Sequence, residues 1–290
     1  MSSLPRVPHV FDAALGRARL ARAHRQGFVD FLLARAAQDL AERLSVVTRV
    51  FAAALDVGTP APLLAEVLRR SGQVGSLVHM APVAGADVVA DPACLPFAPQ
   101  CADLVVSALA LHAVDDLPGA LVQIRRALKP DGLFLACMAG GQTLHELRTA
   151  FVAAESEITG GASPRVAPFA DMRDVGGLLQ RAGFAMPVSD VEVVTVRYGS
   201  MFGLMRDLRG MGATSTLFAR SRTPLRRAVL MRAAEIYGER FADADGRVRA
   251  SFEIIWMSGW APHDSQRKPL KPGSARMRLA DVLGVSEIKP

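Results

Sequence analysis

Cysteines and long apolar runs are scarce in this chain of 290 residues. Its three cysteines, Cys94, Cys101 and Cys137, form neither a CxxC pair nor a cysteine–histidine ligand spacing. This usage is typical of structural thiols in a reducing compartment and indicates no metal site. The longest apolar runs, 104–114 and 133–140, are far shorter than the roughly 20 residues that a membrane-spanning helix needs. We therefore expect no transmembrane segment.

Lysine is also scarce, with only 4 lysines beside 30 arginines, and the formal net charge is +6. We interpret this as a solvated basic surface of an alanine-rich chain and expect no nucleic-acid partner. The start of the chain lacks the pattern of a signal peptide. Acidic residues within 11–44 argue against an organelle-targeting helix and favour a docked pair of helices. We expect a cytoplasmic protein that reaches the inner face of the membrane only through a partner.

Short apolar runs alternate with helical patterns, which predicts an α/β fold with a parallel sheet covered by helices. The expected strands are 50–57, 76–80, 87–90, 103–107, 133–138, 191–198 and 249–260, and the expected helices are 62–70, 117–128, 143–157 and 174–184. An insert rich in methionine and arginine, 199–247, predicts two or three helices over the carboxyl edge of the sheet, where ligands of open sheets bind. We expect N-terminal helices over 1–48, a main domain over 49–260 and a tail over 261–290.

Three motifs at strand ends indicate a cofactor site. In "LDVG" (55–58) an apolar strand delivers Asp56 and Gly58 to a turn where helix amides and the missing side chain admit a cofactor closely. Asp91 follows a strand in "VVADPACLPF", and "ADLVVSALALHAVDDL" leads through Ala108 and Leu109 into a loop. With "LKPDG" further on, this order resembles the class I S-adenosylmethionine (SAM) methyltransferase fold, which is Rossmann-like with an antiparallel edge strand. The resemblance implies that these five residues contact SAM.

Other segments carry a narrower resemblance that covers nearly the whole chain. The segments 11–23, 115–148, 163–184, 198–212 and 254–266 are similar to the complex I assembly arginine-hydroxylase family. The last two, "YGSMFGLMRDLRGMG" and "IIWMSGWAPHDSQ", are specific, because the general methyltransferase fold does not require them. The resemblance implies maturation of a respiratory NADH:quinone oxidoreductase, with a protein subunit of that complex as the partner.

The cofactor motif departs from the family at three positions. Pro60 and Pro62 stand where the family has further glycines, so each lacks an amide donor and adds bulk beside the amino-acid end of SAM. Ala81 stands where an acid should bind the ribose hydroxyls. As a piece of fold the turn remains sound, because Thr59 can cap the next helix and proline is tolerated in a first helical turn. We therefore predict that SAM binding is weak or absent.

Several single residues are weaker candidates for a role in a site. His112 follows the fourth strand and could act as a base, although packing is the simpler interpretation. Tyr198 and Trp256 could contact substrate, with core packing again simpler. His79 and His145 have no metal-like partners. The sequence "DADG" (243–246) lacks the glutamate of a calcium loop and indicates a turn.

Two hypotheses remain open on the sequence. The chain is either a SAM-dependent methyltransferase or arginine hydroxylase, or a non-catalytic assembly factor that has lost the cofactor; a small-molecule methyltransferase is less favoured. For the segment 201–212 we predict a helix with an apolar face packed inward, while Arg206 and Arg209 face an acidic subunit. Neither the substrate nor the oligomeric state follows from the sequence.

Overall fold

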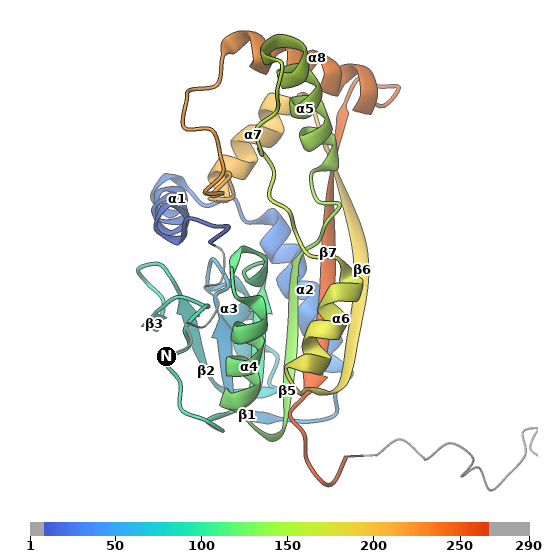
Figure 1. The fold of residues 1–290 in the computed structure, drawn as a ribbon. Coiled ribbons are helices and arrows are strands. Elements are labelled where there is room, and N and C mark those ends of the chain that lie inside the picture. Colours follow the sequence, from blue (N-terminus) through green and yellow to red (C-terminus); the bar gives the residue numbers. More distant parts are fainter. Residues whose placement is uncertain (1–8, 267–290) are drawn as a thin grey trace, which may run out of the picture.

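The computed structural model describes residues 9–266, which form a seven-stranded sheet with helices on both faces (Figure 1). The strand order is β3-β2-β1-β4-β5-β7-β6. The strands are β1 Phe51–Val57, β2 Val74–Ala81, β3 Val88–Val89, β4 Ala102–Ala108, β5 Leu128–Ala139, β6 Ala185–Tyr198 and β7 Val248–Trp260. The helices are α1 Ala13–Gln26, α2 Phe31–Ser45, α3 Leu63–Arg70, α4 Leu117–Ala127, α5 His145–Thr159, α6 Met172–Arg181, α7 Met201–Gly210 and α8 Arg227–Phe241, with a 3-10 turn η1 at Leu111–Ala113.

The expected α/β fold is confirmed. The pairs β1·β2, β1·β4, β2·β3 and β4·β5 are parallel, whereas β7 is antiparallel to both β5 and β6. The antiparallel strand β7 is thus the second strand from the edge of the sheet, and β6 is the edge strand. Among residues 9–266, no helix is both long and apolar enough to cross a membrane.

Alternate residues of the central strands face two separate cores. Ala54 and Leu104 pack with α2 and α3, while their neighbours Leu55 and Val105 pack with α4 and α6. This follows from the two-residue period of a strand, which sends successive side chains to opposite faces. Because both faces are covered, the strands appear in the sequence as continuous apolar runs.

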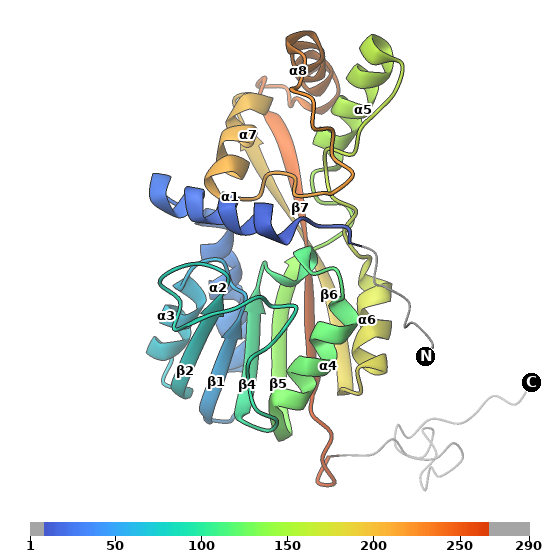
Figure 2. The same cartoon turned by 60° about the vertical axis from the view of Figure 1, so that its left-hand side comes forward.

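An upper lobe stands beyond the carboxyl ends of the parallel strands (Figures 1 and 2). The antiparallel pair β6·β7 continues past β5, because Ala139 at the end of β5 pairs with Ile254, whereas Tyr198 pairs with Val248. The six residues of β7 that precede Ile254 therefore lie beyond the end of β5, which corresponds to about 20 Å of strand. Helices α7 and α8 of the insert pack there with α5. The predicted position of the insert on the carboxyl side is confirmed.

Helix α1 lies between this lobe and the sheet (Figure 2). Its N-terminal flank pairs with the insert, since Phe11 bridges to Leu217 and the Asp12 amide donates to the carbonyl of Thr216 at 2.8 Å. Near the middle of α1, Leu20 lies close to Gly212 of the insert. A Cβ built on Gly212 would lie 2.9 Å from the Leu20 Cα. Helix α1 therefore covers the carboxyl edge, a role that the sequence assigned to the insert alone.

Candidate functional site

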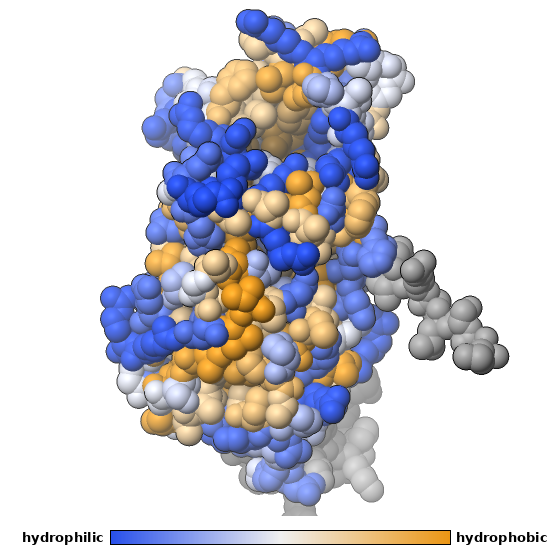
Figure 3. Space-filling view, turned by 90° about the vertical axis from the view of Figure 1, so that its left-hand side faces the viewer, coloured by the Kyte–Doolittle hydropathy of each residue, from blue (hydrophilic) through white to orange (hydrophobic). Residues whose placement is uncertain are grey.

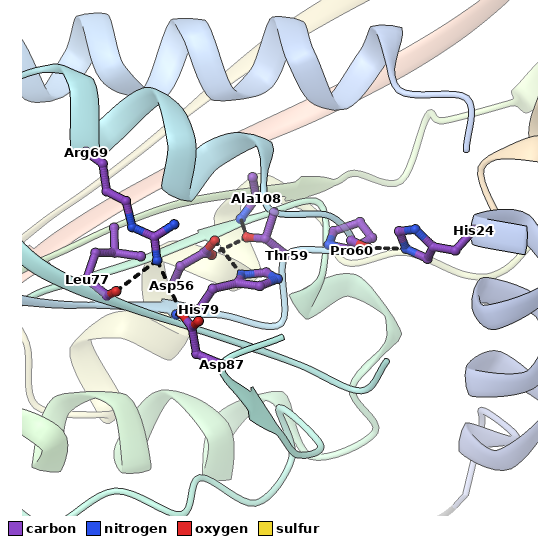
Figure 4. Close-up of polar contacts among 9 residues, drawn as sticks. All are labelled: His24, Asp56, Thr59, Pro60, Arg69, Leu77, His79, Asp87 and Ala108. Atoms are coloured by element: carbon purple, nitrogen blue, oxygen red, sulfur yellow. Dashed lines mark hydrogen bonds and ion pairs between the residues drawn. The ribbon is translucent and has the colours of Figure 1, made fainter. Parts of the chain in front are cut away.

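The turn after β1 is organised by a buried carboxylate. Asp56 and Thr59 are fully buried and His79 is 3% exposed. His79 Nδ1 lies 2.9 Å from Asp56 Oδ2, and the Thr59 hydroxyl donates to Asp56 Oδ1 (Figure 4). The Ala108 amide donates in turn to Thr59 Oγ1 at 3.0 Å. Both oxygens of Asp56 are therefore engaged by side chains from β2 and from the turn itself.

The partnership of Asp56 and His79 follows from strand register. The two residues are paired neighbours in the parallel β1·β2 ladder. Burial raises the pKa of Asp56 above its ordinary value, and the hydrogen bonds from His79 and Thr59 oppose that rise. Sequence reasoning missed this role of His79. The signal that could have found it is that two parallel strands carry Asp56 and His79 toward the same edge.

The remaining part of the turn is closely packed. Gly58 has φ +78°, and a Cβ there would lie 3.0 Å from the Ala110 Cβ and 3.1 Å from the Pro92 Cβ. Glycine is therefore required by the backbone conformation and by contacts within the chain. Pro62 precedes α3 with φ −71°, as a proline readily adopts. The Pro60 carbonyl lies 2.7 Å from His24 Nε2 of α1 (Figure 4).

The other three residues expected to contact the cofactor are also engaged. Asp91 is held by α1, because Arg17 Nη1 lies 3.3 Å from its Oδ2 while the Ala93 amide donates to its Oδ1. Ala108 is fully buried. Leu109 has φ +50°, and its amide donates to the Cys137 carbonyl at 2.9 Å. The structure thus gathers these residues near one edge of the sheet.

These contacts do not fit SAM well. The predicted ribose position, Ala81, is a fully buried alanine at the end of β2. Asp87, the nearest following acid, accepts hydrogen bonds from the His79 amide at 2.8 Å and from Arg69 at 3.2 Å (Figure 4). Both of these hydrogen bonds are accepted by Asp87 Oδ2, so Asp87 is anchored to β2 and α3.

The weaker candidates lie apart from this turn. Trp256 is 2% exposed in β7, with the Arg43 guanidinium 4.4 Å from its ring centroid, so the structure places it in the core. Tyr198 ends β6 in the upper lobe, where burial and Asp207 raise its pKa. Neither residue is brought to the Asp56 turn.

His112 lies in η1, after β4, and lines a groove on the α4 and α6 side of the sheet. Burial lowers the pKa of His112 to about 4, so the imidazole is neutral at pH 7. Its Nδ1 is buried without a hydrogen-bond partner in the described part of the chain. The lining of the groove includes none of the five residues expected to contact the cofactor.

The described residues contain no cluster of three or more histidine, cysteine or acidic side chains that could hold a metal ion. All three cysteines are free, and burial raises the pKa of Cys137 to about 12. The "DADG" segment forms the predicted turn, in which the Gly246 amide donates to the Asp243 carbonyl at 2.9 Å.

Comparison with known proteins identifies the family. The arginine-hydroxylase NDUFAF5 of Danio rerio, a mitochondrial protein, is 40% identical over 273 residues, which cover 90% of this chain and 84% of that protein. This chain belongs to the NDUFAF5 arginine-hydroxylase family. A methyltransferase-domain family also matches residues 55–136, the part of this NDUFAF5 relative that carries the Asp56 turn.

Solved structures share the Rossmann-like fold of this NDUFAF5 relative. The YcgJ protein of Bacillus subtilis matches this chain with a TM-score of 0.53 and 12% identity. The match covers 78% of this chain and 99% of YcgJ. The cyclase SpnF matches with a TM-score of 0.51 and 16% identity. This match covers 90% of this chain and 99% of SpnF. At such identities the likeness shows the fold alone, and fold does not fix chemistry.

Proposed function

We propose that this chain acts on a protein subunit of a respiratory NADH:quinone oxidoreductase during its maturation, and that an arginine of that subunit is the residue modified. The single observation that supports this proposal is the 40% identity to an arginine hydroxylase over 90% of the chain. The non-catalytic alternative is not favoured, because the relatives carry the name of an enzyme. The partner would bring this protein to the inner face of the membrane.

We further propose that SAM binds weakly or not at all in this member of the family. Asp56 is satisfied by His79 and Thr59, and Asp91 is held by Arg17. A ligand would have to displace these contacts and would find no acid at Ala81. The retained methyltransferase fold would then serve mainly as a scaffold for the carboxyl edge and the upper lobe.

We propose the exposed side of α7 as the surface for the protein partner. Met201, Leu204 and Leu208 are buried, and Arg206 and Arg209 are exposed, as the sequence predicted. On the face shown in Figure 3, hydrophilic residues surround an apolar patch. A basic surface formed by Arg206 and Arg209 is complementary to an acidic subunit.

The proposal is tested by mapping the oxidoreductase from cells with and without the gene. Peptides of the purified complex are compared by mass spectrometry, and we expect one arginine to lose the mass of a single oxygen atom when the gene is deleted. Returning the wild-type gene should restore that mass. Defective assembly without any change at an arginine would favour the non-catalytic alternative. An unchanged complex that assembles normally would refute both.

A further inference from the structure

The positive charge of the chain is concentrated in two segments that pack together. Residues 9–30, which include α1, and residues 199–222, which include α7, hold eight arginines and three acidic residues. Their formal net charge is +5, whereas the whole chain carries +6. Nearly all of the excess positive charge therefore lies in 46 of the 290 residues.

Tertiary contacts join these segments into one surface, which we call the α1–insert surface. The chain that follows α7 runs along α1 (Figure 2). Arg19 of α1 donates a hydrogen bond to the Ser215 carbonyl, and Arg220 Nη2 lies 3.3 Å from Oδ2 of Asp12, the residue that caps α1. Arginines from distant parts of the sequence are thereby brought together.

Most of these arginines lack an acidic partner. Among residues 9–266, only two of the eight make an ion pair, Arg17 with Asp91 and Arg220 with Asp12. By contrast, Arg232 of α8 makes ion pairs with three glutamates. The arginines of the α1–insert surface that remain without an ion pair in the described chain are Arg19, Arg22, Arg25, Arg206, Arg209 and Arg222.

Some of these arginines are close enough to repel one another. Burial lowers the pKa of Arg19, and the neighbouring charges of Arg220 and Arg22 lower it further. The charge of Asp12 opposes this effect. An anionic partner would relieve the repulsion, because it would bring negative charge to several guanidinium groups at once.

Acidic residues of other segments do not cancel this charge. In the described chain, two of them form hydrogen bonds or ion pairs with the α1–insert surface. Asp91 contacts Arg17, and Asp115 accepts from the amides of Val10 and Phe11 at 3.1 and 2.9 Å. When both are included, three positive charges remain unbalanced.

The same segments expose aromatic side chains. Phe202 of α7 is 39% exposed, and Phe218 is 43% exposed. Phe218 lies beside the N-terminal flank of α1, because its amide donates to the Val10 carbonyl at 2.9 Å. Arginine and aromatic residues are enriched where proteins bind one another. This combination favours a protein over a small ion such as free phosphate.

We propose that the α1–insert surface binds an acidic segment of a protein partner, whose carboxylates pair with the arginines of α1 and of the chain that follows α7. The proposal rests on the proposed function in taking the partner to be a protein. It goes beyond Arg206 and Arg209, because it adds α1 and residues 213–222 to the docking surface.

The probe for this surface is a fluorescent peptide of alternating glutamate and serine, about 16 residues long, titrated with the full chain. At about 100 mM salt, exposed charges more than about 10 Å apart are largely screened, so binding reports on the local surface. We expect saturable binding with a dissociation constant tighter than about 1 mM. The same peptide with glutamine in place of glutamate should not bind.

Matched variants locate the contact. Arg25→Gln with Arg222→Gln removes two exposed charges, one from α1 and one from the chain that follows α7, and should weaken peptide binding about three- to tenfold. Arg70→Gln with Arg126→Gln removes two exposed charges from α3 and α4 and should weaken it less than about 1.5-fold. Melting curves establish that both variants are folded. In the wild type, amide resonances of α1 should shift as the peptide is added, whereas those of α4 should not.

Three results would overturn the proposal. These are no saturable binding of the glutamate peptide, equal weakening by the two double variants, and tighter binding of an oligothymidylate with the same number of charges, which would indicate a nucleic-acid surface instead. Mass spectrometry of the arginine in the partner tests the proposed function separately, so failure of one proposal is distinguishable from failure of the other.

Discussion

Individual side chains at the carboxyl edge bind one another where the family resemblance implies that they bind a cofactor. Asp56 with His79 and Asp91 with Arg17 are the clearest cases. Two or three missing cofactor contacts of about 1 to 1.5 kcal/mol each would move a micromolar ligand toward the millimolar range. We therefore expect calorimetric titration with SAM, and with its demethylated product, to give millimolar or undetectable binding. A dissociation constant of a few micromolar would contradict this.

The contribution of α1 to the expected weak binding of SAM can be measured separately. Arg17→Ala leaves Asp91 free to accept a hydrogen bond from SAM and should strengthen binding up to about tenfold. Arg25→Ala changes an exposed arginine of the same helix and should have no effect. Pro62→Gly with Ala81→Asp tests the turn itself. If none of these variants binds more tightly, contacts other than these close the site.

His112 should make stability depend on pH. Its pKa of about 4 in the folded protein lies below the ordinary value of 6.5, so between these values the unfolded chain binds a proton that the folded chain does not. The stabilisation is present above pH 6.5 and is lost as the pH falls toward 4. Between pH 7.5 and pH 5 the wild type should lose about 2 kcal/mol more than His112→Gln. Urea unfolding at both values checks this, and equal losses would refute it.

At the scale of elements, α1 depends on a close contact at the end of α7. Gly212 follows α7 with φ +73°, and the Ala213 amide donates to the Leu208 carbonyl at 2.8 Å, as at many helix ends. A side chain at 212 would meet the Leu20 backbone. Helix α1 can therefore lie over the sheet only because residue 212 has no Cβ.

Gly212→Ala should destabilise the protein by about 1 to 3 kcal/mol, because alanine adopts positive φ poorly and its Cβ pushes α1 away. Amides of α1 should then exchange faster with deuterium, whereas those of β4 should change little. Gly238→Ala in α8 is the control and should stabilise by about 0.5 to 1 kcal/mol. Unaltered exchange in α1 would show that Gly212 does not hold this helix.

For the whole molecule, net charge and its position on the surface govern the encounter with a partner. Reversing Arg206 and Arg209 to glutamate should change the free energy of unfolding by less than about 0.5 kcal/mol, because both side chains are exposed. Association with the cognate respiratory subunit should weaken, and its salt dependence should decrease.

Reversing Arg70 and Arg126, which are exposed on α3 and α4, makes the same change of net charge elsewhere on the molecule. Binding assays that compare the two double variants show whether the position of the reversed charges or the total charge of the protein weakens association. Equal weakening by the two would mean that α7 is not the docking surface.

Part of this protein could be predicted from local patterns. The strands around Asp56 and Asp91, the insert helices and the inward face of α7 follow from apolar runs and helical periodicity, which depend on near neighbours in the chain. The strand over 133–138 was predicted too short, because Leu128 joins it through pairing with Ala102 of the adjacent strand. Predictions for residues 1–8 and 267–290 lie outside the described residues.

The sequence by itself determined the order of the elements, the candidate residues at the strand ends and the two prolines in the turn after β1. Only the tertiary structure decided what those residues contact. Strand register places His79 beside Asp56, and docking of α1 brings Arg17 to Asp91 across 74 positions of sequence. Such contacts depend on how distant segments pack, and no local spacing encodes that packing.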